Sequence, residues 1–216
     1  MGRSDPYIFS FYRKHIKPKG DVALLGWVDN SQYKGDLYDL QLKNWDINSD
    51  WSLGKKYDTI ICTRTAYFAK DPELFISKCY NHLNEGGTLY ADWGFGDHWR
   101  FPDFKVGWVK NNEHEWAYQK GNFLWSTVWS DEFLEDKEVQ KFSQEIKTLG
   151  YHDIKKAIKE EVPEVLSLES IGKYFHVTYN ILQLGGTFAW GAKIEQIKPQ
   201  LYILISGKKN EPIKKL

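Results

Sequence analysis

The stretch from residue 57 to residue 93 constrains the fold most, because two apolar runs in it bracket one amphipathic segment. Residues 59–62 form a short β-branched run that suits a strand buried on both faces. Asp71 and Pro72 fit the cap and first turn of a helix, whose apolar residues recur at helical spacing. We expect Gly86-Gly87 to end this helix and residues 88–92 to form a second strand. The pattern predicts a right-handed crossover that joins two parallel strands.

This stretch resembles the second half of class I S-adenosylmethionine (SAM)-dependent methyltransferases. In that family an aromatic-Asp pair opens the fourth strand, as Tyr57-Asp58 does here, and residues 70–73 match the start of the next helix. A Leu-x-x-Gly-Gly turn, here residues 83–87, leads into the fifth strand. The resemblance implies an α/β fold: a Rossmann-like methyltransferase sheet with an antiparallel C-terminal hairpin and a shortened N-terminal half. The alternative is an ordinary crossover in another doubly wound protein.

The composition fits one domain over residues 1–216, with a Trp-rich β insertion at residues 100–130. Lys+Arg and Asp+Glu both number 29, so no global field favours nucleic acid. Cys62 and Cys79 fall at expected core positions, which indicates reduced thiols and a cytoplasmic protein rather than a disulfide or a metal site. The sequence contains no apolar run that would span a membrane and no signal peptide, so we expect no membrane association.

The half of the sheet that would hold a cofactor is trimmed. Residues 21–28 are expected to form the first strand, but the glycine-rich loop of the family is reduced to Gly26. Residues 29–35 contain turn formers without apolar periodicity, so they are interpreted as a loop in place of a helix. Residues 36–40 and 45–48 are interpreted as shortened second and third strands.

The resemblance nevertheless implies a SAM site at the ends of these strands. An acidic residue after the second strand binds the ribose hydroxyls, and Asp36 and Asp39 are the candidates. Asp46 and Ile47 match an Asp and an apolar residue that contact the adenine in the family. Polar residues after the fourth strand are natural contacts for the amino acid part of SAM. The full set of cofactor candidates is Gly26, Trp27, Asp29, Asp36, Asp39, Asp46, Ile47, Thr63 and Arg64.

The methyl acceptor is expected above the end of the fifth strand. Methyl transfer needs alignment of the two partners and the removal of one proton, for which Asp92, Asp97 and His98 are the candidate bases. Aromatic rings hold planar or cationic acceptors, and the candidates here are Tyr67, Trp93 and Trp99. The chain lacks the Asn/Asp-Pro-Pro-Tyr signature of enzymes that methylate amino groups in nucleic acids. Each of these residues also has a structural interpretation, as a turn, cap or packing residue.

Outside the crossover, five further segments are expected to form elements. Residues 7–16 are interpreted as a short helix or an arm packed across the sheet, which is either a packing element or a lid. Three alternating runs within residues 105–129 predict an antiparallel meander. This meander is interpreted as a packing face, as a roof over the acceptor pocket, or as a surface for a homodimer or a partner subunit. Residues 130–149 and 164–184 are expected to be helices, and residues 193–197 and 200–206 a closing hairpin.

Three hypotheses about function follow. The first is a SAM-dependent methyltransferase with an unknown acceptor, for which the neutral charge and aromatic residues favour a small molecule. The second is a non-catalytic binding or regulatory subunit with the methyltransferase fold, supported by the missing glycines and the missing first helix. The third is an enzyme that binds a different nucleotide-like ligand. Fold analogy alone does not identify an acceptor.

Overall fold

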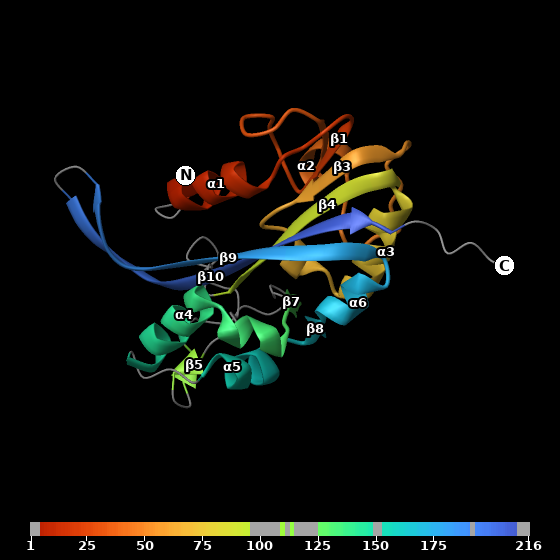
Figure 1. Cartoon of the computed structure of the whole chain (residues 1–216). Coiled ribbons are helices and arrows are strands. Elements are labelled where there is room, and N and C mark those ends of the chain that lie inside the picture. Colours follow the sequence, from red (N-terminus) through yellow and green to blue (C-terminus); the bar gives the residue numbers. More distant parts are fainter. Residues whose placement is uncertain are drawn as a thin grey trace.

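A mixed six-stranded sheet organises the computed structural model, which describes residues 5–95, 109–110, 113–114, 125–148, 153–190 and 193–210 (Figure 1). The strand order is β2-β1-β3-β4-β10-β9. Strands β1 to β4 are mutually parallel, whereas β10 runs antiparallel to both β4 and β9. The bounds are β1 Val22–Leu25, β2 Asp36–Tyr38, β3 Tyr57–Cys62, β4 Leu83–Phe95, β9 Phe175–Trp190 and β10 Lys193–Lys209. The expected α/β fold with an antiparallel C-terminal pair is therefore present.

The crossover between β3 and β4 contains helix α3, Pro72–Asn81. Phe75, Ile76 and Cys79 are buried on its inner face, as the helical spacing predicts. The expected helix end at Gly86-Gly87 is wrong, because the helix ends at Asn81 and both glycines belong to β4. The β3–β4 register shifts between Tyr57 and Thr59, opposite these glycines, and Gly86 takes a φ of +70° there. The two glycines thus form an irregularity in the strand rather than a helix cap.

Asp71 caps α3 through its side chain, which accepts a hydrogen bond of 2.8 Å from the Leu74 backbone N–H. We expect Asp71→Ala to lower the free energy of unfolding by about 1 kcal/mol, because it leaves this N–H without its acceptor. Urea titration monitored by circular dichroism measures the change. Asp50→Ala, at an exposed position outside the helix, is the control and should stay near wild type. Equal stability of the two variants would contradict the role of the cap.

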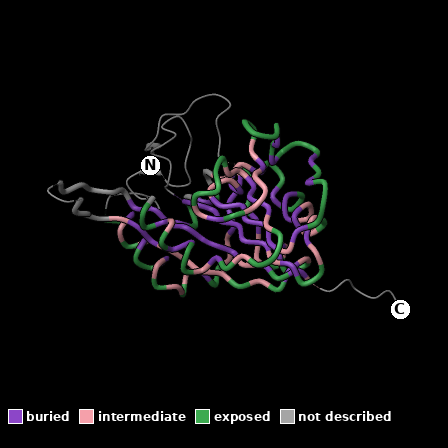
Figure 2. Tube along the Cα trace, turned by 90° about the horizontal axis from the view of Figure 1, so that it is seen from above, coloured by how far each residue is buried: buried purple, intermediate pink, exposed green. Residues whose placement is uncertain are grey.

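Helix α1, Asp5–His15, covers one face of the sheet (Figure 1). Its inward side chains Ile8, Phe11 and Tyr12 are buried together with residues of β1, β3, β4, β9 and β10. The first interpretation of residues 7–16, a short helix against the sheet, matches this arrangement. The strands beneath α1 form the buried centre of the molecule seen in Figure 2. The N-terminal helix is therefore an integral part of the core.

The connection from β1 to β2 is a loop without a helix, as expected. The expected third strand at residues 45–48 is wrong. After β2 the chain forms the short helix α2, Leu40–Lys43, and then a turn in which Asp46 accepts a 2.9 Å hydrogen bond from the Asn48 N–H. This local side-chain bond stabilises a turn in place of a strand.

The other face of the sheet carries short elements from three regions of the chain: η1 Ala66–Phe68, β7 Ser126–Val128, η2 Asp131–Glu135, α4 Lys137–Thr148, α5 Ile154–Glu161, β8 Glu164–Leu166 and α6 Leu168–Gly172. The helix expected at residues 130–149 is largely confirmed by η2 and α4. The meander is only partly matched. β5 Val109–Lys110 and β6 Glu113–His114 pair antiparallel, but β7 pairs in parallel with β8. Trp125 and Trp129 flank β7, and the other meander residues lie outside the described part of the chain.

The helix expected at residues 164–184 is wrong. This segment contains β8, α6 and the first ten residues of β9, where β-branched and aromatic residues such as Val177, Tyr179 and Ile181 suit a strand. The expected hairpin between residues 193–197 and 200–206 is also wrong. Both runs lie in β10, which pairs along β9 with a register shift between Ile197 and Gln200.

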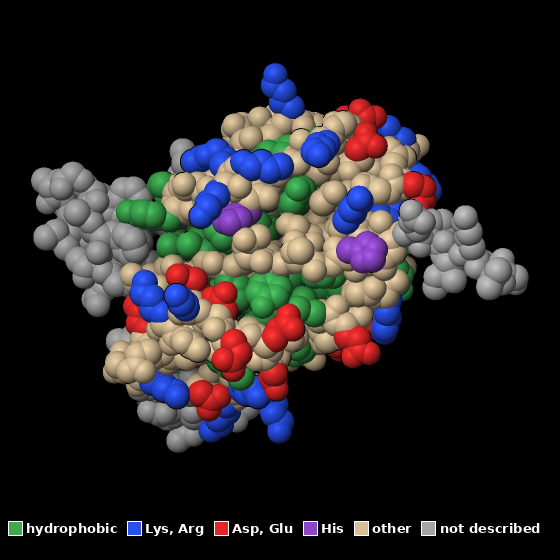
Figure 3. Space-filling view, viewed as in Figure 1, with side chains coloured by type: hydrophobic (Ala, Val, Ile, Leu, Met, Phe, Trp, Pro, Cys, Tyr) green, Lys and Arg blue, Asp and Glu red, His purple; other side chains and the backbone are tan. Residues whose placement is uncertain are grey.

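The surface has both signs of charge. Figure 3 shows Lys and Arg side chains over α1, a mixture of Asp, Glu and Lys or Arg side chains on the side of η2 and α4, and hydrophobic groups between them, along β9. Arg13 and Lys14 of α1 are exposed, as are Glu132 and Glu135 of η2. Helix α4 itself carries both signs, with Lys137, Lys141 and Lys147 beside Glu138 and Glu145, and the charges balance across the chain. Among the described residues, no helix has the length and apolar character needed to cross a membrane.

Candidate functional site

The carboxyl ends of the parallel strands meet at one edge of the sheet, where doubly wound folds bind ligands. Gly26 follows β1 at this edge, and its N–H donates a 2.7 Å hydrogen bond to the carbonyl oxygen of Tyr38 at the end of β2. It takes a φ of +75°, and a Cβ atom placed on it would lie 2.1 Å from Oγ1 of Thr65. Gly26 therefore makes room for a side chain of the loop after β3.

Trp27 belongs to the loop after β1, and its ring lies between Phe9 of helix α1 and Tyr33 of the same loop. Its ring is 6.2 Å from the ring of Phe9 and 5.7 Å, edge-on, from the ring of Tyr33. Its Nε1 and the hydroxyl of Tyr33 are buried, and neither has a hydrogen-bond partner among the described residues. Burial raises the pKa of Tyr33 to about 12. Asp29 is exposed, and its carboxylate accepts a hydrogen bond from Ser31, which lowers its pKa.

Asp92 carries a carboxylate at this edge and has no exposed surface. It follows Ala91, which pairs with Cys62 at the end of β3. Its Oδ2 accepts a hydrogen bond from the Tyr12 hydroxyl, and its Oδ1 accepts one from the Arg64 backbone N–H. Burial and the neighbouring Asp92 carboxylate raise the pKa of Tyr12 well above its usual value. Both oxygens are therefore engaged, so a role of Asp92 as a free general base does not match this arrangement.

Thr63 and Arg64 occupy the loop between these contacts. Thr63 is 3 % exposed, and its Oγ1 has no hydrogen-bond partner among the described residues. Arg64 takes a left-handed φ of +59°, a conformation that costs a non-glycine residue free energy. Its side chain is half-buried, and its positive charge offsets part of the rise in the pKa of Tyr12. The structure thus brings Gly26, Trp27, Thr63, Arg64 and Asp92 to the same edge.

The two candidate ribose ligands lie at opposite ends of β2. Asp39 directly follows the strand, at the edge that holds Gly26, and its side chain accepts a 2.9 Å hydrogen bond from the Gln41 N–H as the cap of α2. Asp36 begins β2 at the other edge, where it accepts a 2.7 Å hydrogen bond from the Tyr57 hydroxyl and lies 3.4 Å from Nζ of Lys55. These contacts lower its pKa. Asp36 is thus wrongly assigned to the cofactor edge, because it starts the strand that it was expected to end.

Asp46 and Ile47 form part of the turn after α2. The Asp46 side chain is exposed, whereas Ile47 is 7 % exposed and belongs to the main hydrophobic core. The carbonyl oxygen of Ile47 accepts a hydrogen bond from Nε1 of Trp51. The expected stacking of Ile47 on an adenine ring is not available in this arrangement, because the core already covers that side chain.

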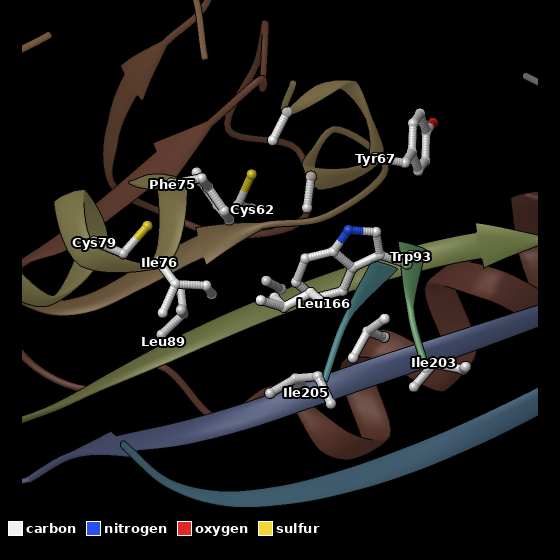
Figure 4. Packing of buried hydrophobic residues seen from close by; sticks show 14 of the residues in the cluster. Cys62, Tyr67, Phe75, Ile76, Cys79, Leu89, Trp93, Leu166, Ile203 and Ile205 are labelled. Atoms are coloured by element: carbon white, nitrogen blue, oxygen red, sulfur yellow. The ribbon is translucent and has the colours of Figure 1, made fainter. Parts of the chain in front are cut away.

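Two of the three aromatic residues expected to bind an acceptor are described, and both are buried. Trp93 is 1 % exposed and Tyr67 is 2 % exposed. Figure 4 shows the Trp93 ring in the core cluster with Leu166 and Ile203. Nε1 of Trp93 has no hydrogen-bond partner among the described residues. Both rings therefore pack the core, and the remaining candidates Asp97, His98 and Trp99 lie outside the described residues.

Cys62 and Cys79 are buried free thiols, as expected, and burial raises the pKa of both. In the part of the chain that the structure describes, no group of three or more His, Cys, Asp or Glu side chains could hold a metal ion.

Two residues of this edge were not among the sequence-based candidates. Thr65 lies two residues after Thr63, and no motif distinguishes it. Tyr12 belongs to an aromatic N-terminal segment, and its pairing with a residue 80 positions away leaves no signal in a single sequence.

The sequence matches no family model and no curated protein. The structure is similar to a SAM-dependent methyltransferase from Thermotoga maritima described as a possible histamine N-methyltransferase, with 13% identity, 96% of this chain and 90% of that chain covered and a TM-score of 0.43. It is also similar to the N-methyltransferase NodS from Bradyrhizobium japonicum in complex with S-adenosylhomocysteine, with 9% identity, 95% and 88% covered and a TM-score of 0.40.

Proposed function

We propose that this protein is a SAM-dependent methyltransferase that acts on a small molecule. The observation that carries the proposal is the convergence of Gly26, Asp39, Thr63 and Asp92 at the carboxyl edge of four parallel strands. A carboxylate directly after the second strand is suited to accept hydrogen bonds from both ribose hydroxyls. Asp39 is the carboxylate in that position, and one oxygen of it already accepts a backbone hydrogen bond.

The residues of this edge would bind and align rather than react. SAM supplies a methyl group on a sulfonium, so the transfer is a direct displacement that depends on alignment. Asp39 would hold the ribose, and the hydroxyl of Thr63 would offer a hydrogen bond to the amino acid part. The buried carboxylate of Asp92 contributes negative charge near a cationic ligand. A small-molecule acceptor is favoured because the chain has no net charge to attract nucleic acid.

A second candidate function is a non-catalytic subunit with this fold. It is favoured by the side chains that fill the edge: Thr65 lies against Gly26, and Trp27 lies between Phe9 and Tyr33. A ligand that contacts the Gly26 backbone must displace Thr65. In this case the protein binds neither SAM nor its product.

Calorimetric titration with SAM and with S-adenosylhomocysteine tests the proposal. We expect micromolar binding by the wild type and about tenfold weaker binding by Asp39→Asn. Asparagine retains an oxygen for the helix cap but loses the negative charge that strengthens the hydrogen bonds from the two ribose hydroxyls. Asp36→Asn is the matched control at the amino edge and should bind as the wild type does. No binding of either compound by the folded wild type would refute the methyltransferase proposal and favour the second candidate.

A further inference from the structure

The buried carboxylate of Asp92 connects two segments that are distant in sequence. One oxygen accepts the hydroxyl of Tyr12 from α1, and the other accepts the backbone N–H of Arg64 from the loop after β3. Tyr12 and Asp92 have no exposed surface. A buried charge is stable only where it is hydrogen-bonded, and both the Tyr12 hydroxyl and the Arg64 N–H contribute to that stabilisation.

The loop that Asp92 holds is strained. Arg64 has a φ of +59°, and a non-glycine residue remains in this region only where its surroundings fix it. Thr63 precedes it with a buried, unpartnered hydroxyl, and Thr65 follows it with a side chain against Gly26. The conformation of Arg64 therefore determines how both threonines face the carboxyl edge.

Helix α1 packs into the core beside Asp92 and the loop after β3. Ile8 of the helix and Ile16, directly after it, are 0 % and 2 % exposed, and they pack in the same cluster as Tyr12. The Tyr12 hydroxyl is thus held near Asp92 by a helix that is part of the core.

We propose that Tyr12 is a positioning residue for the carboxyl edge of the sheet. Through its hydrogen bond to Asp92, Tyr12 fixes the left-handed turn at Arg64 and thereby the placement of Thr63 and Thr65. The effect of Tyr12 on ligand binding rests on the proposed function, whereas the coupling between Tyr12 and the turn at Arg64 does not. Asp92 in this assignment is the link between the two segments and not the base of the reaction.

Hydrogen exchange of backbone amides, measured by NMR on the whole chain, tests the coupling. In Tyr12→Phe the carboxylate loses one donor, and we expect the Arg64 amide to exchange about tenfold faster. Tyr57→Phe is the matched control, because Tyr57 donates a 2.7 Å hydrogen bond to the carboxylate of Asp36 at the other edge of the sheet. It should leave exchange at Arg64 unchanged. Asp92→Asn retains an acceptor for the Arg64 N–H, so exchange there should stay slow.

Titration of the same variants with S-adenosylhomocysteine tests the consequence for the ligand. We expect about tenfold weaker binding by Tyr12→Phe and wild-type binding by Tyr57→Phe. Unchanged exchange at Arg64 in Tyr12→Phe, or an equal rise in Tyr57→Phe, would overturn the coupling. Faster exchange with unchanged affinity would overturn the positioning role while the proposed function stands. A wild type that binds no ligand would overturn the proposed function and the ligand role, and the exchange data would still decide the coupling.

Discussion

A Gly26→Ala variant is expected to lose about 3 kcal/mol of its free energy of unfolding. The new Cβ would lie 2.1 Å from Oγ1, 2.7 Å from Cγ2 and 2.8 Å from Cβ of Thr65, so rotation of the threonine side chain cannot relieve every contact. Overpacking of this kind costs about 1–3 kcal/mol. The left-handed φ of +75° adds about 1 kcal/mol for a residue with a Cβ atom.

Gly54→Ala separates these two contributions. Gly54 has nearly the same φ, +73°, but a Cβ placed on it meets no atom within 4 Å. It should therefore lose only about 1 kcal/mol. Urea unfolding of both variants, with equal m-values required, provides the measurement. Similar losses in the two variants would mean that the loop after β3 moves away at little cost, and Thr65 would then be no obstacle to a ligand at Gly26.

The crossover was predictable because its signals are local. The β-branched run of β3, the Asp71 cap and the apolar spacing of α3 all lie within about 25 residues and agree with one another. The end of α3 was not predictable from Gly86-Gly87, because glycine suits a helix cap and a strand irregularity equally well. Only the pairing of β4 with β3 decides between the two.

The C-terminal third shows the opposite case. Residues 164–184 have apolar side chains at spacings that fit a helix, but Phe175 to Ile181 include strand formers, and β10 pairs with β9 over 15 residue pairs. Tertiary pairing therefore prevailed over the helical pattern. The same pairing makes residues 193–209 one long strand instead of two short ones.

The location of the candidate site at the carboxyl edge of the sheet was predictable, but the individual residues that form it were not. Gly26 and Thr63 follow strands that the sequence identifies, so their common location was foreseeable. Asp36 and Asp39 differ by three positions, and the exact start of a three-residue strand decides which of them reaches the site. The contact of Tyr12 with Asp92 depends on how α1 crosses the sheet, which no local pattern specifies.

Lys209, at the end of β10, is a lysine with only 5 % of its surface exposed. Its Nζ donates a 2.9 Å hydrogen bond to the carbonyl oxygen of Leu83, lies 3.3 Å from Oε1 of Glu85 and lies 4.3 Å from the centre of the Tyr80 ring. These contacts connect the last strand of the sheet to the segment where α3 gives way to β4. Lysine is rarely buried unless such partners are present.

We expect Lys209→Ala to lower the free energy of unfolding by about 2 kcal/mol, because it removes a charged hydrogen bond and the packing of the aliphatic stem. The loss should stay below that of a fully buried ion pair, since Glu85 is 60% exposed and remains hydrated. Lys209→Met retains the stem and removes the ammonium, so the difference between the two variants measures the packing. Lys208→Ala, at the adjacent exposed position, should change the stability by less than about 0.5 kcal/mol. If Lys209→Met is as stable as the wild type, the ammonium contributes nothing, and the connection between β10 and the start of β4 is made by packing alone.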